Sequence, residues 1–185
     1  MTRSVSPTPD RTSPSTASTA PTGRRVAAGL IDAATFLVLP AALVPLGLWL
    51  VSAGVVPSTA AVNLIGLIGV VLPATVWTAG WHAARGATPG QRRFGLSVIM
   101  MDSGRRPHLG VALLRAVIKI AVPWELGHTA ALGLAAGHAP GVGLWVVVSA
   151  AYLLPVITFI GLLRRPHRPL HDRIAHTVVV TDVRA

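Results

Sequence analysis

The sequence places an aspartate inside an apolar stretch that is long enough to cross a lipid bilayer. Asp32 lies in the run 26–51 and follows Arg25 by seven residues, which is two turns along one helix face. A carboxylate at the centre of a membrane helix costs roughly 2.5–3.5 kcal/mol on insertion scales, and such residues usually face the bundle interior or a wet cavity. We therefore expect Asp32 either to carry a proton or ion, or to form a buried ion pair that fixes helix packing.

Two arginines are candidate partners for Asp32. Arg25 lies about 10 Å nearer the membrane surface by helical rise, and its side chain covers only part of that distance. Arg115 lies at the foot of another apolar run. Beside an arginine, Asp32 would stay charged and act as a structural staple. Without one, burial would favour its protonated form, which suits ion-coupled transport. The sequence leaves both alternatives open.

A second polar set lies within the run 116–136. Arg115 and Lys119 are four residues apart and share one helix face, whereas Glu125 and His128 are three apart and share another. A carboxylate and an imidazole at membrane depth would form a proton relay. The alternative is that this helix ends near its outer surface and both groups are in water. We favour the second interpretation, because this run is the least hydrophobic of its kind in the chain.

The composition indicates a membrane protein. Hydrophobic residues make up 52% of the chain and charged residues 12%, with a mean hydropathy of +0.63, whereas a soluble domain is nearer a quarter charged. The net charge of +10 does not indicate nucleic-acid binding, because the arginines cluster between apolar runs and Tyr152 is the only tyrosine. The absence of cysteine excludes disulfides, thiolate metal sites and a cysteine nucleophile.

Four apolar runs predict four transmembrane helices, at about 26–51, 60–84, 116–136 and 142–163. Each exceeds the roughly 20 residues needed to cross the hydrocarbon, and the third is the weakest because it contains charged residues and Pro123. Residues 1–23 are rich in Ser, Thr and Pro and are predicted to form a disordered cytoplasmic tail. Residues 24–183 then form the transmembrane domain.

The arginines predict the orientation in the membrane. They cluster before the first run, between the second and third, and after the fourth, whereas the loops 52–59 and 137–141 contain no lysine or arginine. Because positive charge marks cytoplasmic loops, both termini are expected in the cytoplasm of a multi-pass cell-membrane protein. The same arginines are expected to contact anionic lipid headgroups.

The long cytoplasmic loop has signals for local structure. Thr88 is a suitable helix cap and Pro89 fits a first helical position. The segments 96–101 and 177–183 have strand composition, lie beside turn signals and fall on the same side of the membrane, so we expect them to pair. The predicted fold class is therefore all-α integral membrane, with four transmembrane helices and a small cytoplasmic layer that contains two short paired β-strands.

Four segments of the chain resemble the RDD membrane family. They are Arg25-Val-Ala-Ala-Gly-Leu-Ile-Asp32, Gly86-Ala-Thr-Pro-Gly-Gln-Arg-Arg-Phe-Gly-Leu-Ser-Val98, Leu113-Leu-Arg115 and His171-Asp-Arg-Ile-Ala-His-Thr-Val-Val179. The family is named for one arginine and two aspartates, which match Arg25, Asp32 and Asp172. One departure is His176, where the family commonly has glycine. The resemblance implies a multi-pass membrane protein involved in transport.

We therefore expect transport of an ion or small solute, with a functional charge network of Arg25, Asp32, Arg115 and Asp172 and a secondary polar set of Lys119, Glu125 and His128. Four helices make a small transporter, so a homo-oligomer or a membrane partner protein is expected. The alternative is a non-transporting accessory or scaffold subunit that binds a membrane partner or anionic lipid. No nucleophile–base pair or convincing metal cluster is visible, so we expect neither an enzyme nor a bound cofactor or metal.

Overall fold

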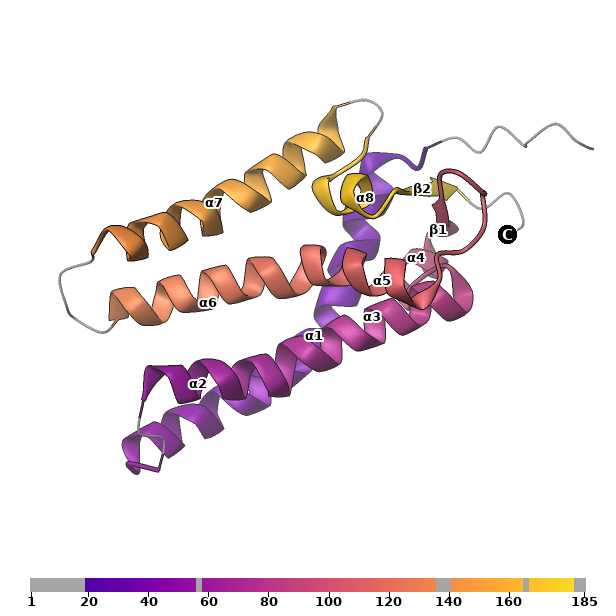
Figure 1. Cartoon of the computed structure of the whole chain (residues 1–185). Helices are drawn as coiled ribbons and strands as arrows, with labels where there is room; N and C mark the ends of the chain where they lie inside the picture. Colours follow the sequence, from indigo (N-terminus) through magenta and orange to yellow (C-terminus); the bar gives the residue numbers. More distant parts are fainter. Residues whose placement is uncertain (1–18, 56–57, 136–140, 165–166, 182–185) are drawn as a thin grey trace, which may run out of the picture.

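The computed structural model describes residues 19–55, 58–135, 141–164 and 167–181. These residues are mostly helical, with one two-stranded sheet (Figure 1). The elements are α1 (Thr22–Ser52), α2 (Thr59–Gly66), η1 (Leu67–Val71), α3 (Leu72–Arg85), α4 (Pro89–Arg93), β1 (Leu96–Met100), α5 (Leu109–Ala116), η2 (Val117–Ala121), α6 (Val122–Ala135), α7 (Val142–Leu163), α8 (Leu170–Ile174) and β2 (Thr177–Thr181). The run α2–η1–α3 forms one long helix, and α5–η2–α6 forms another.

Three helices are long and apolar enough to cross a membrane: Thr22–Gly47, Ala60–Arg85 and Val142–Leu163. They correspond to the first, second and fourth predicted spans. The third predicted span falls on the helix α5–η2–α6 and on residue 136, which lies outside the described residues. That helix is not among the three, and its polar residues Lys119, Glu125 and His128 lower its hydropathy.

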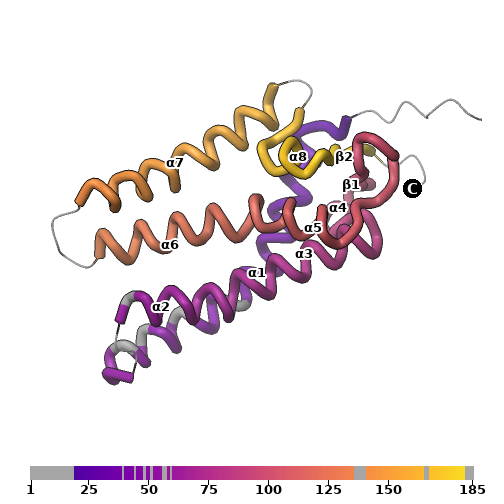
Figure 2. Tube along the Cα trace, in the orientation of Figure 1, coloured from indigo at the N-terminus to yellow at the C-terminus, as the bar shows by residue number. Residues whose placement is uncertain are grey.

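The long helices run alternately away from and back towards one end of the molecule, and α4, α8 and the two strands form a layer at that end (Figure 1). The tube in Figure 2 shows that the start of α1 and the segment α8–β2, which are far apart in sequence, meet in this layer. The Thr22 hydroxyl donates a hydrogen bond to the carbonyl of Leu162 at 3.2 Å, which ties the start of α1 to the end of α7.

The two strands pair as the sequence predicts. β1 and β2 are antiparallel, with Leu96 opposite Thr181 and Met100 opposite Thr177. The last predicted strand residues, 182–183, lie outside the described part of the chain. One face of the sheet packs in a small core of Ala20, Ala28, Leu96, Val98 and Val179, so burial of alternate residues fixes the register.

Residues 19–23, which the composition assigns to a disordered tail, belong to the folded part of the chain. Residues 1–18 lie outside the described residues, but residues 19–23 are not a disordered tail. Thr19 forms a β-bridge with Val180, and the Ala20 N–H donates to the carbonyl of Val179 at 3.0 Å. Ala20 is fully buried. A small residue can follow the edge of β2 closely, and this extra pairing was not visible in the composition of the segment.

Two π-helical turns interrupt the long helices. After η1 the N–H of Leu72 bonds the carbonyl five residues back, and Val122 does the same after η2. In each case the next residue is a proline, Pro73 or Pro123. Proline lacks an N–H and its ring clashes with the carbonyl four residues earlier, so a wider turn accommodates it. The two turns contact each other, so the irregular turns of the two helices lie side by side.

His176, the departure from the family pattern, has a backbone φ of +50°. This is the left-handed region, which glycine adopts without steric cost and which other residues adopt at a cost. It lies two residues after the end of α8 and turns the chain into β2. His176 therefore adopts the conformation that glycine would favour, and the closing segment folds as an unbroken helix–turn–strand unit.

Candidate functional site

Asp172 lies between two arginines from other helices. Its Oδ2 accepts a hydrogen bond from Arg25 Nη2 at 2.5 Å, and its Oδ1 accepts one from Arg115 Nε at 2.8 Å. The Asp172 side chain is fully buried and the two arginine side chains are nearly so. Burial alone would raise the pKa of Asp172, but the neighbouring cations, Arg115 first, hold that pKa well below its usual range. Three of the four predicted network residues therefore form one buried ion cluster, which joins α1, α5 and α8.

Asp32 is bound to the start of α4 and to neither arginine directly. It is 8% exposed; its Oδ2 accepts a hydrogen bond from the Thr88 hydroxyl at 2.5 Å and its Oδ1 accepts one from the Gly90 N–H at 2.9 Å. Thr88 caps α4 and forms a capping box with Gln91. A Cβ on Gly90 would lie 2.3 Å from the carbonyl oxygen of Ala28, so only glycine allows α4 to approach α1 this closely.

Asp32 nevertheless connects to the ion cluster through three polar residues. Gln91 Oε1 accepts hydrogen bonds from the Thr88 N–H and from His82 Nε2, both at 3.0 Å. The His82 ring lies 3.5 Å from Arg115 Nη1, and His82 is fully buried. The polar chain thus runs from Asp32 through Thr88, Gln91 and His82 to Arg115.

Sequence reasoning found the capping role of Thr88 but missed that its hydroxyl would bind Asp32. The spacing of Thr88 and Gln91 is that of a capping box, so that pair had a signal. His82 had only a weak signal, a polar residue within an otherwise apolar helix.

Two cavities meet at Asp32 and Lys119. The first, of about 350 Å³, lies between α1, η2 and α7 and is also lined by Arg25, Arg115, Phe159 and His171. The second, of about 330 Å³, lies between α1 and the helix η1–α3 and reaches Trp124. Gly29, Asp32 and Lys119 line both cavities. Both cavities therefore border the same polar residues, Asp32 and Lys119.

Lys119 is the only lysine in the sequence. It is half-buried, it lies in η2, and no residue in the described ranges forms a hydrogen bond or an ion pair with its ammonium group. The charges of Asp32 and Arg115 act on it from nearby. The other predicted members of its set lie elsewhere: Glu125 and His128 face α2, on the far side of Trp124.

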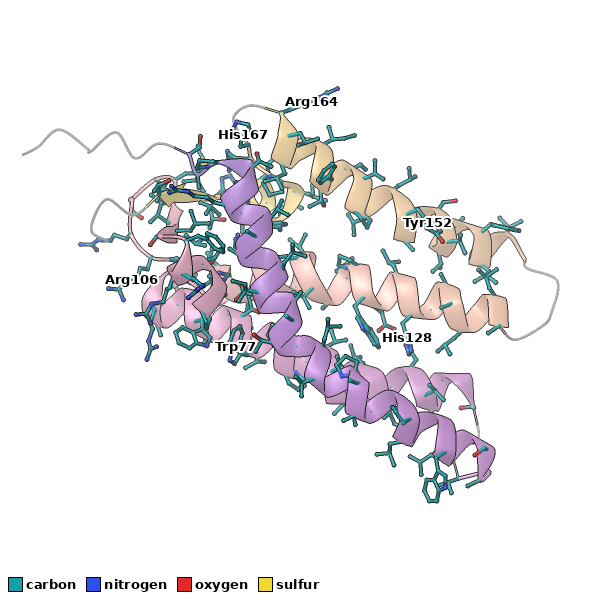
Figure 3. All side chains as sticks on the ribbon, turned by 180° about the vertical axis from the view of Figure 1, so that it is seen from behind. Trp77, Arg106, His128, Tyr152, Arg164 and His167 are labelled. Atoms are coloured by element: carbon teal, nitrogen blue, oxygen red, sulfur yellow. The ribbon has the colours of Figure 1, made fainter. Side chains whose placement is uncertain are left out.

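Glu125 and His128 are joined by Asn63 of α2. The Asn63 amide donates a short hydrogen bond to Glu125 Oε1, and its carbonyl oxygen lies 2.6 Å from His128 Nδ1. The Trp124 ring lies against the His128 ring, with 4.3 Å between centroids. Figure 3 shows His128 pointing from α6 towards α2. The interpretation that both groups merely face water overlooked Asn63, which lies 62 residues before Glu125.

A family model described as the RDD family matches residues 19–176. The chain belongs to the RDD family. No curated protein and no solved structure matches it. In this RDD protein Asp32 binds α4, while Arg25 binds Asp172 of α8, so these three residues attach the short helices α4 and α8 to the long ones. Family membership and the three apolar helices together indicate a membrane protein.

Proposed function

We propose that this RDD protein spans the cell membrane four times and moves a small solute or ion across it. The observation that carries the proposal is that two cavities are both lined by Asp32 and Lys119. They lie between three helices that are long and apolar enough to span and the helix that contains η2. Transport sites commonly lie where membrane helices are discontinuous. Here η1 and η2 interrupt two neighbouring helices, and Lys119 lies in one of these interruptions.

The charges around the first cavity favour a solute that carries an anionic group. Arg25 and Arg115 are occupied by Asp172, and both oxygens of Asp32 accept hydrogen bonds. Lys119 has no such partner within the described residues. An ammonium group that is half-buried between apolar walls attracts an anion more strongly than it would in water. Lys119 is therefore the residue that we expect to contact the solute, with Asp32 limiting the affinity.

The test is flux of small anions, namely chloride, phosphate and acetate, into vesicles that contain the purified protein. Replacing Lys119 with Met keeps its length and removes its charge, which should lower the flux of the transported anion by roughly tenfold or more, the worth of one charge-assisted hydrogen bond. Lys119→Arg should keep most of the flux. Arg93→Gln removes one exposed cation outside the cavities and serves as the matched control. Equal flux in wild type and Lys119→Met would contradict the proposal.

A second candidate function is that of a non-enzymatic accessory subunit that binds a membrane partner, a second copy or anionic lipid. The observation that favours it is the exposure of α7, of which only 6% of the membrane-spanning window is buried within the chain. In this case vesicles would show no flux for wild type or variants. Crosslinking from an exposed position such as Tyr152, which is 74% exposed, would then capture a protein or lipid.

A further inference from the structure

The carboxyl group of Glu125 is only half satisfied. Its Oε1 accepts hydrogen bonds from Asn63 and from the Thr129 hydroxyl, the latter at 3.5 Å. Its Oε2 is shielded from solvent, and none of the described residues donates to it. Leaving a buried carboxylate oxygen without a donor is costly, and a buried carboxylate commonly becomes neutral instead.

The packing of α6 against α7 places this group at mid-depth. A Cβ on Gly133 would lie 2.6 Å from the side chain of Leu144, so these residues of two antiparallel helices lie opposite each other. Moving eight residues back along α6 and eight forward along α7 pairs Glu125 with Tyr152, near the middle of α7. Because α7 is long and apolar enough to span, Glu125 lies far from both ends of the span.

The Asn63 bridge fixes one proton and leaves another variable. Since the Asn63 amide N–H₂ faces Glu125, its carbonyl oxygen faces His128, and His128 Nδ1 must therefore carry a hydrogen. The remaining positions are His128 Nε2 and Glu125 Oε2. With no proton there the trio of Asn63, Glu125 and His128 is negative, and with two it is positive. With one proton, on either residue, it is neutral.

We propose that Asn63, Glu125 and His128 form a proton-binding site that holds one proton at neutral pH. Glu125 is the one charged group that acts on His128 among the described residues, and Asn63 and Trp124 are uncharged. None of the ion pairs among the described residues involves Glu125, so no salt bridge compensates a net charge on the trio. Net charge at mid-membrane costs several kcal/mol, which favours the neutral state. The proton belongs to the coupled pair rather than to one residue.

The surroundings connect this site to the cavities. Trp124 lines the second cavity, and its ring packs against the ring of His128. A Cβ on Gly66 would lie 2.6 Å from Trp124 and 3.4 Å from His128, so α2 closes tightly over both rings. Uptake or loss of the proton would change the charge directly behind Trp124. Proton binding at this site could therefore be coupled to the transport proposed above. This inference rests on the four-span arrangement of that proposal.

The experiment uses the fact that Glu125 is the only glutamate in the sequence. The full chain is made by cell-free synthesis with carboxyl-¹³C glutamate, placed in lipid nanodiscs and measured by infrared spectroscopy at pH 7. In His128→Gln the other proton carrier is removed, so the single proton must lie on Glu125. We expect the labelled carbonyl band of a protonated acid to replace the carboxylate bands. His108→Gln, which changes an exposed histidine at the cap of α5, should give the wild-type spectrum.

The outcome that would overturn the proposal is an ionised Glu125 in His128→Gln at pH 7, as in a free glutamate. If gel filtration shows that His128→Gln does not fold, His128→Leu is measured instead, because it also removes the second proton carrier. The measurement does not require transport. If the acid band is present but there is no flux, the proton-binding site stands and the proposed transport is wrong. If there is flux but no acid band, the proposed transport stands and the proton-binding site is wrong.

Discussion

At the scale of single residues, Asp172 is the central charge of the structure, because it compensates two buried arginines. If Asp172 is changed to Asn, Arg25 and Arg115 remain buried without a counter-charge. Breaking a buried ion cluster in this way costs about 3–5 kcal/mol. We expect that loss in unfolding measurements of the purified protein in detergent. Asp102→Asn, at an exposed turn, is the control and should be neutral. Equal stability of wild type and Asp172→Asn would mean that the cluster does not hold α8.

The same residue contributes to the loss of stability in acid. Because the folded pKa of Asp172 lies well below its ordinary value, the unfolded chain binds its proton first as the pH falls. Its contribution is therefore complete above about pH 5 and is lost progressively below about pH 4. His171 acts in the same direction at milder pH. Burial, and then Arg115, hold its pKa well below the ordinary value, so stability falls once the unfolded imidazole is protonated, below about pH 6.5.

At the scale of elements, the contact of α4 with α1 depends on Gly90. In Gly90→Ala the new methyl group would lie 2.3 Å from the carbonyl of Ala28 and 2.8 Å from Asp32 Oδ1, so α4 must move away and lose its hydrogen bond to Asp32. Overpacking of this kind costs typically 1–3 kcal/mol. We expect a lower melting temperature and faster amide exchange in α4. Gly80→Ala, where a Cβ meets nothing within 4 Å, is the matched control and should be neutral or stabilising. Unchanged exchange in α4 would show that α1 does not hold it.

The elements also show what the sequence could predict. Strand pairing of β1 with β2 followed from composition and turn signals, and the cap of α4 followed from Thr88 and Pro89, because these are local patterns. The partners of Asp32 could not be predicted, because they are a hydroxyl and a backbone N–H more than 50 residues downstream. Asn63 was missed for the same reason: an amide within an apolar run has no sequence pattern that identifies its partner.

At the scale of the whole molecule, the helices are tied firmly at one end. The start of α1 bonds the end of α7 through Thr22, and Arg25 donates to the carbonyl of His167 at 2.5 Å. Away from this layer, α1 and α7 lie on different sides of α6 (Figure 1), and the first cavity lies between α1, η2 and α7. In the proposed transport, the helices would separate away from this layer to admit a solute, and the buried ion cluster would stay intact.

The four-span topology is the prediction on which both proposals depend. The arginines at the start of α1, at the end of α3, shortly before α5 and at the end of α7 all lie at the end that carries the layer, so we expect this end to be in the cytoplasm. Reporter fusions after residues 55 and 100, within 136–140 and after 181 should therefore be outside, inside, outside and inside. The informative position is 136–140. A cytoplasmic reporter there would mean that α5–η2–α6 does not cross the membrane, because its charged residues keep it at the surface. Glu125 would then have no reason to be neutral, and Lys119 could not contact a solute inside the bilayer.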